Sequence, residues 1–219
     1  MLLHQTVIGL EAMEQMRLAG DEPDVIIGCT GGGSNFAGLV MPFLKRKIKG
    51  QTDARVVAVE PAACPSLTKG KFTYDFGDTG HLTPLVKMFT LGSTFIPPGI
   101  HAGGLRYHGM APLVSHVKDL GLVEAIAVQQ LDAFAAGIQF ARAEGILPAP
   151  EANHAIAGVF REAQRAKEEG NERTILFNLC GHGHFDMQSY IDYQAGKLLN
   201  YEYPAEEIAM ALAGLPATS

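Results

Sequence analysis

Apolar residues along this chain alternate between short β-branched runs and longer stretches with helical spacing. Val25, Ile26 and Ile27 form one short run, which is typical of a buried strand, and apolar positions from Phe36 to Leu44 then recur at helical intervals. The same reading predicts strands at 55–60, 122–128 and 173–178. It predicts helices at 2–19, 34–47, 112–120, 129–144, 151–169, 185–196 and 204–213. Strands that alternate with helices predict an α/β fold, with a mostly parallel sheet between helices in three layers.

Residues 61–111 interrupt this pattern. Their periodicity is weak, and glycine and proline are frequent, as in Ile96-Pro97-Pro98-Gly99. We therefore expect a long, mostly irregular segment between two regular parts of the chain. Segments of this length without regular structure are more often functional than idle.

Composition narrows the class of protein. The 219 residues are 47% hydrophobic and 18% charged, which is typical of a folded chain with a sizeable core. The net charge of -6, without blocks of like charge, argues against nucleic acid and against an anionic membrane surface as partners. No apolar run reaches the ~20 residues of a membrane span. The three cysteines are scattered and form no CxxC pair, which favours a reducing, cytoplasmic location.

The first candidate site follows the strand at 25–27. Gly31, Gly32 and Gly33 precede Ser34 and Asn35, where the next helix begins. Glycines let the backbone approach an anion closely, and the free N–H groups of a helix N-terminus point toward it. Ser34 can cap the helix and also donate its hydroxyl to a phosphate oxygen. The pattern predicts a phosphate site, and a tight turn without ligand is the alternative.

Other motifs give weaker signals. His101 and His108, and likewise His182 and His184, lack the additional ligands that a metal site needs. A dinucleotide-binding loop requires a third glycine that the 31–36 segment does not supply. Glu151 lies in the first turn of a predicted helix, a position that the helix dipole alone would explain.

Four segments taken together resemble the C-terminal half of the tryptophan synthase β chain, a fold-type II enzyme dependent on pyridoxal 5′-phosphate. The opening Leu2–Gly9 and the Gly-Leu-Arg-Tyr-His-Gly sequence at 104–109 resemble the stand-alone, second class of β chain. The four segments are Gly31–Asn35, Ala102–Tyr107, Glu144–Ala155 and Asn178–Asp186.

The resemblance implies a domain organisation and a set of cofactor contacts. Residues 1–200 would form the cofactor-phosphate domain, and residues 201–219 a C-terminal helical tail. Glu151 would lie beside the cofactor ring, where it acts in catalysis by tuning the protonation of the ring. The implied cofactor-binding residues are Gly31, Gly32, Gly33, Ser34, Asn35, Glu151, Cys180 and Gly181.

Two positions depart from the family pattern. Cys180 stands where the family usually has a serine that hydrogen-bonds the pyridine nitrogen. Arg106 stands on the substrate side, where the complex-forming class has an aspartate that contacts the substrate hydroxyl. The resemblance also implies a monovalent cation, K⁺ or Na⁺, on backbone groups of Gly31, Tyr107 and Gly109.

The implied reaction joins L-serine and indole to give L-tryptophan and water, which makes the family a carbon–oxygen lyase of amino-acid biosynthesis. The family's Schiff-base lysine lies upstream of the phosphate loop, and the residues before Gly31 contain no lysine. We therefore expect a fragment that lacks the N-terminal part of the fold and is inactive alone. The alternatives are a cysteine synthase-like or threonine dehydratase-like enzyme, or a non-catalytic remnant that binds the cofactor phosphate. A homodimer and an α subunit are further implied partners.

Overall fold

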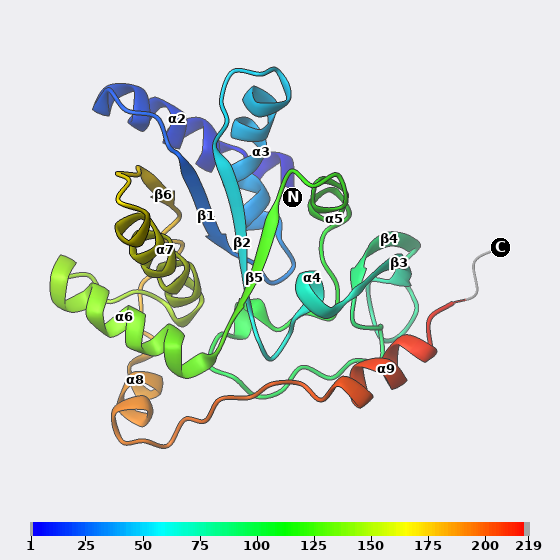
Figure 1. Cartoon of the computed structure of the whole chain (residues 1–219). Coiled ribbons are helices and arrows are strands. Elements are labelled where there is room, and N and C mark those ends of the chain that lie inside the picture. The colour runs from blue at the N-terminus through cyan, green and yellow to red at the C-terminus, as the bar shows by residue number, and fades with distance from the viewer. Residues whose placement is uncertain (1, 217–219) are drawn as a thin grey trace.

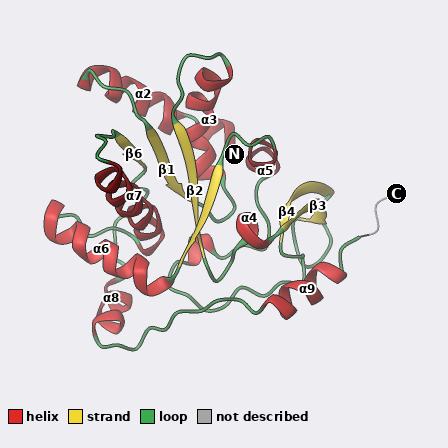
Figure 2. Cartoon of the chain, in the orientation of Figure 1, coloured by secondary structure: helices red, strands yellow, loops and turns green. Residues whose placement is uncertain are grey.

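The computed structural model describes residues 2–216. A four-stranded parallel sheet with the order β5-β2-β1-β6 forms its centre (Figures 1 and 2). Register pairs Ile27 of β1 with Val57 of β2 and with Phe177 of β6. The strands of this sheet are β1 (Val25–Cys29), β2 (Arg55–Pro61), β5 (Glu124–Val128) and β6 (Ile175–Phe177).

Helices cover both faces of the sheet, as Figure 1 shows. On one face Ile26, Val56 and Ala58 pack against Phe36 and Phe43. This layer contains α1 (Leu2–Gln5), α2 (Val7–Ala19), α3 (Ser34–Ile48) and α5 (Pro112–Asp119). Alternate residues of the same strands point to the other layer, because side chains alternate across a strand.

The opposite face of the sheet carries a second apolar core. Val25, Ile27 and Val59 pack there with Ala133 of α6 and Ile156 of α7. The elements of this side are α6 (Gln130–Glu144), α7 (Pro150–Glu169) and α8 (Met187–Gln194). Burial of a large apolar side chain stabilises the fold by about 1.5–3 kcal/mol, so the two cores together hold the sheet between its helices. The predicted three-layer α/β fold is confirmed.

The segment 61–111 is more regular than predicted. It contains α4 (Ser66–Lys69), β3 (Lys71–Phe76), β4 (Leu85–Thr90) and a 3₁₀ turn, η1 (Gly103–Leu105). Strands β3 and β4 form an antiparallel hairpin outside the main sheet, in which Phe72 lies opposite Phe89 and stacks on it. The prediction of a mostly irregular segment is therefore wrong between 66 and 90. Cross-strand pairs of aromatic side chains stabilise this hairpin, although glycine and proline are frequent in the segment.

The two ends of the chain differ in how well the sequence predicted them. The helix expected at 2–19 is divided at Thr6, whose hydroxyl donates a hydrogen bond to the carbonyl of Leu3 at 2.6 Å. The predicted tail contains α9 (Ala205–Ala213), and its Ile208 belongs to the same core as Val25 and Ile27. Met1 and residues 217–219, which the two predicted domains include, lie outside the described residues.

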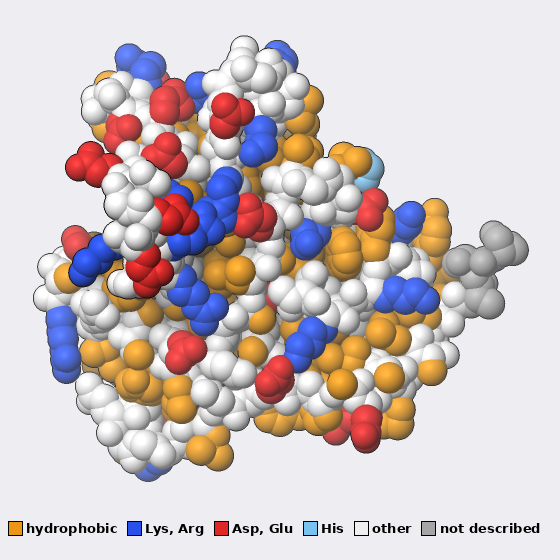
Figure 3. Space-filling view, in the orientation of Figure 1, with side chains coloured by type: hydrophobic (Ala, Val, Ile, Leu, Met, Phe, Trp, Pro, Cys, Tyr) orange, Lys and Arg blue, Asp and Glu red, His pale blue; other side chains and the backbone are white. Residues whose placement is uncertain are grey.

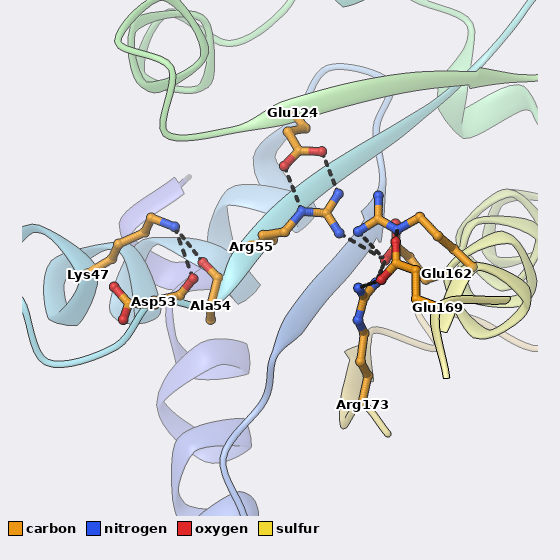
Figure 4. Close-up of polar contacts among 9 residues, drawn as sticks. Lys47, Asp53, Ala54, Arg55, Glu124, Glu162, Glu169 and Arg173 are labelled. Atoms are coloured by element: carbon orange, nitrogen blue, oxygen red, sulfur yellow. Dashed lines mark hydrogen bonds and ion pairs between the residues drawn. The ribbon is translucent and has the colours of Figure 1, made fainter. Parts of the chain in front are cut away.

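A charged network ties the start of the strands to α7 (Figure 4). The buried carboxylate of Glu162 contacts Arg55 at 2.9 Å and both Arg165 and Arg173 at 3.2 Å. Arg55 also donates to Glu124, and this hydrogen bond holds the pKa of Arg55 above its ordinary value. Basic and acidic side chains consequently intermix on this face, as the space-filling view shows (Figure 3). In residues 2–216 no helix combines the length and apolarity that crossing a membrane requires.

Candidate active site

The glycine loop joins β1 to α3 and has a fixed shape. Gly33 occupies the N-cap position of α3 with a left-handed φ of 90°, which favours glycine. A Cβ atom on Gly31 would lie 2.5 Å from the carbonyl oxygen of Gly104, so no side chain fits there. The carbonyl of Gly32 accepts a hydrogen bond from the backbone N–H of Ala111 at 2.9 Å.

Ser34 is the first residue of α3 rather than its cap. The expectation that Ser34 caps the helix is therefore wrong, because Gly33 holds that position without a side-chain hydrogen bond. The first N–H groups of a helix have no acceptor within it. Ser34, Asn35 and Phe36 all line a cavity in front of this terminus. The loop and the helix terminus thus present backbone donors and the positive end of the helix dipole to one small space.

This cavity has a volume of about 230 Å³ and is formed by four separate segments of the chain. They are the glycine loop with the start of α3, the η1 turn, the first turn of α7 and the loop after β6. The lining residues are Cys29, Gly31, Gly32, Gly33, Ser34, Asn35, Phe36, Gly104, Leu105, Tyr107, Glu151 and Cys180.

Glu151 reaches the cavity from the first turn of α7. Its Oε1 atom accepts a hydrogen bond from the backbone N–H of Gly104 at 2.9 Å. One turn further along α7, the buried His154 ring lies 2.9 Å from the carbonyl of Pro150 through Nδ1. Burial lowers the pKa of His154, so the neutral ring donates from Nδ1 and supports the turn that carries Glu151. The position of the carboxylate is therefore fixed from both sides.

Two thiols and two amides lie near the carboxyl ends of β1 and β6. The Sγ atoms of Cys29 and Cys180 are 3.5 Å apart. The hydrogen bond with Cys180, together with burial, raises the pKa of Cys29 well above its ordinary value. The same bond lowers the pKa of Cys180. Asn178 donates from Nδ2 to Oδ1 of Asn35 at 2.7 Å, which links the loop after β6 to the start of α3.

The cavity collects most of the predicted site residues. Gly31, Gly32, Gly33, Ser34, Asn35, Glu151, Cys180 and Tyr107 all line it. Arg106 and Gly181 do not: the Arg106 guanidinium donates to the carbonyl of Pro97 at 2.9 Å, and the Gly181 carbonyl accepts from Ala149. Gly109 lies in a bridge to Thr90 of β4.

Four lining residues were not predicted individually from the sequence. Cys29 and Phe36 flank the glycine loop, and their adjacency to it was the available signal. Gly104 and Leu105 belong to a segment that carried the family resemblance, but their contact with Glu151 and Gly31 depends on the tertiary fold.

Two kinds of group are missing from the site in the described part of the chain. Among residues 2–216, none of those that line the cavity is a lysine. No cluster of three or more His, Cys, Asp or Glu side chains within the same residues is placed to hold a metal ion.

Curated relatives match most of this chain. It is 57% identical over 198 residues to "Tryptophan synthase beta chain 2" of Methanosarcina acetivorans, and this match covers 90% of the chain and 45% of the relative. It is 60% identical over 190 residues to the protein of the same name from Thermotoga maritima, with 87% and 45% covered. The Aquifex aeolicus protein of that name is 58% identical, with 90% and 46% covered. The chain thus spans about half the length of these relatives.

Two solved structures share the fold. The L-serine ammonia-lyase of Rhizomucor miehei superposes with a TM-score of 0.64 at 18% identity, over 89% of this chain and 56% of the other. The T.th. threonine deaminase gives a TM-score of 0.60 at 18% identity, over 84% and 58%. At this identity the likeness concerns the fold alone.

A family model decides the classification. The model described as "Pyridoxal-phosphate dependent enzyme" matches residues 1–181, which include the glycine loop, the η1 turn, Glu151 and Cys180. The resemblance found in the sequence is thereby confirmed, and this chain belongs to the family of pyridoxal-phosphate dependent enzymes.

Proposed function

We propose that this chain forms the phosphate-binding side of a tryptophan synthase β-type active site, which converts L-serine and indole into L-tryptophan and water. One observation carries the proposal: a single cavity collects the glycine loop, Glu151 and Cys180. The high identity to proteins named tryptophan synthase beta chain supports the choice of reaction within the family.

The residues at the cavity fit the phosphate end of the cofactor. Gly31, Gly33 and the first turn of α3 leave room for an anion and offer it backbone N–H groups. A side chain at Gly31 would collide with the backbone of Gly104, so the cradle depends on the missing Cβ atom. Bound there, pyridoxal phosphate supplies the electron sink that stabilises a carbanion of the amino-acid substrate.

The polar groups beyond the glycine loop suit the ring of the cofactor. Glu151 is held by the Gly104 N–H with its second carboxylate oxygen free of that bond. In our proposal this carboxylate lies beside the ring and Cys180 faces the ring nitrogen. A thiol is a weak hydrogen-bond partner, so it holds the nitrogen without forcing a proton onto it.

Several parts of the predicted site stay proposals. The lysine that holds the cofactor is supplied, in our account, by a part of the polypeptide outside these 219 residues, since no lysine among residues 2–216 lines the cavity. Arg106 on the substrate side, Gly181 at the cofactor, and a K⁺ or Na⁺ ion near Gly31, Tyr107 and Gly109 remain predictions. So do the division into 1–200 and 201–219, the homodimer, the α subunit and the cytoplasmic location.

A chimera tests the reaction. Residues 2–200 would replace the matching segment of the Thermotoga maritima relative, whose 60% identity makes the exchange conservative. We expect the chimera to form L-tryptophan from L-serine and indole, as the parent protein would in parallel assays. Deamination of threonine, or turnover of O-acetylserine with sulfide, in place of that reaction would contradict the proposal and favour the alternatives.

A further inference from the structure

Two thiols meet at the edge of the cavity. Cys29 is the last residue of β1, and Cys180 lies just beyond β6, the strand that pairs with β1 in parallel. Their Sγ atoms are 3.5 Å apart, and both residues line the cavity. The third cysteine, Cys64, is buried after β2 and is not among the lining residues.

The separation of the two sulfur atoms is close to what a covalent bond requires. A disulfide has an S–S length of about 2.05 Å, so the atoms must approach by about 1.5 Å. Neighbouring strands lie roughly 4.8 Å apart, and disulfide-linked Cα atoms are usually about 4.4–6.8 Å apart. Because β1 and β6 pair in parallel up to Ile27 and Phe177, the chain ends that carry the two cysteines adjoin, and we expect side-chain rotation to close the remaining gap.

The two cysteines differ in reactivity. Cys180 is half-buried and shares a hydrogen bond with Cys29, and this bond lowers the pKa of Cys180 and favours its thiolate. Cys29 is only 6% exposed and remains protonated, since the same bond and its burial raise its pKa. A thiolate attacks a peroxide more readily than a thiol does, and a neighbouring thiol then displaces the oxygen from the oxidised sulfur.

We propose that Cys29 and Cys180 form a peroxide-oxidisable dithiol that closes an intramolecular disulfide at the cofactor cavity. The Cys180 thiolate attacks one oxygen of hydrogen peroxide, the O–O bond breaks, and the departing hydroxide takes up the proton that Cys180 had released, to leave as water. Cys29 sulfur then displaces the second oxygen from Cys180 as water, with its own proton. Two thiols lose two electrons and two protons, and one peroxide is reduced to two waters.

The disulfide has a consequence for the cofactor, which rests on the proposed function. In the disulfide the Cys180 sulfur is bonded to Cys29 and is neither a thiol nor a thiolate, so it loses the contact with the ring nitrogen that the proposed function assigns to it. We therefore expect the oxidised chain to bind pyridoxamine 5′-phosphate several-fold more weakly than the reduced chain, and dithiothreitol to restore the affinity.

Peptide mapping tests the proposal without any cofactor. The 219-residue chain is treated with hydrogen peroxide, its remaining thiols are alkylated, and it is digested with trypsin. Before alkylation we expect the intact mass to fall by two hydrogen atoms, and after digestion peptide 18–45 to be joined to peptide 174–197 within one chain. Dithiothreitol should separate the two peptides. Oxygen adducts on separate cysteines, a link to Cys64, a link between two chains, or unreacted thiols would each overturn the proposal.

Single-residue variants test which cysteine is oxidised first and which one closes the disulfide. Cys64→Ser is the matched control, and it should keep the cross-link. Cys29→Ser should abolish it and leave Cys180 as a sulfenic acid that dimedone traps, whereas Cys180→Ser should leave Cys29 unreacted. Circular dichroism reports whether each variant folds, and Cys29→Ala provides a second variant at the buried position. Binding of pyridoxamine phosphate is measured in a separate experiment. If the reduced chain does not bind it, the proposed function is contradicted, whereas the dithiol proposal is tested by the mass of the cross-linked peptides alone.

Discussion

Single residues in this site are constrained mainly by backbone geometry. Gly33 combines a φ of 90° with a position where a Cβ atom would lie 2.5 Å from the Met110 sulfur. Glu151 and Cys180, in contrast, are placed by hydrogen bonds to Gly104 and Cys29. The glycine pattern predicted a phosphate loop and the family resemblance added Glu151, but the partners that hold these residues come from distant segments and could not be read from spacing.

Gly33→Ala tests the shape of the phosphate loop. Gly50→Ala is the matched control, because Gly50 also has a positive φ of 65° but open space around its Cα atom. The control should lose about 1–2 kcal/mol of unfolding free energy from strain alone. Gly33→Ala should lose more unfolding free energy than the control. Its affinity for pyridoxamine phosphate should also fall at least about tenfold, because the backbone N–H donors of the loop are displaced. Urea unfolding and fluorescence titration measure both, and unchanged affinity in Gly33→Ala would contradict the assignment of the loop.

Glu60 provides a pH-dependent signature of the fold. Its side chain is fully buried, and burial raises its pKa from 4.5 to about 7, although the Thr68 hydroxyl and the N–H groups of Leu67 and Thr68 oppose the shift. A folded-state pKa above the unfolded value stabilises the fold at low pH, and this contribution is lost as pH rises from 4.5 to 7. Relative to Glu60→Gln, the native chain should lose roughly 3 kcal/mol across this window. Urea unfolding at several pH values checks this, and parallel curves would contradict it.

Helices and strands with strong periodicity were the elements that the sequence predicted well. Strand β1, helix α3 and helix α7 lie within a few residues of their predicted bounds, because each carries an unbroken apolar face. The β3–β4 hairpin was missed because its strands are half-exposed and lie among glycines and prolines. The split at Thr6 was missed because a local hydroxyl bond to Leu3 decides it.

Glu162 tests how α7 is held to the sheet. Its carboxylate is the shared partner of Arg55, Arg165 and Arg173. Glu162→Ala removes the carboxylate that the three arginines share, although Glu124 still pairs with Arg55 and Glu169 with the other two. The loss of these charge-assisted hydrogen bonds should cost about 1.5–3 kcal/mol of unfolding free energy. The control Glu14→Ala breaks an exposed pair with Arg17 and should change nothing measurable. Equal stability of the two variants in urea would show that the network does not anchor α7.

In the whole molecule, the cavity lies at the carboxyl ends of β1 and β6. Strand order β5-β2-β1-β6 brings the carboxyl ends of β1 and β6 together, and α7 adds Glu151 across from them. The α/β class followed from the alternation of strands and helices. The meeting of four segments around one cavity followed from the family resemblance, because hydrophobic spacing does not encode which loops adjoin. The position of Arg106 outside the cavity lining was visible only in three dimensions.

The most direct test of the account is the binding of pyridoxamine 5′-phosphate compared with pyridoxamine, which lacks the phosphate. Neither compound has the aldehyde that a lysine would capture, so the measurement concerns the cavity alone. We expect fluorescence titration to give at least about tenfold tighter binding of the phosphate form, through charge-assisted hydrogen bonds at the glycine loop. Equal affinity for the two compounds, or no binding of either, would contradict the claim that this cavity holds the cofactor phosphate.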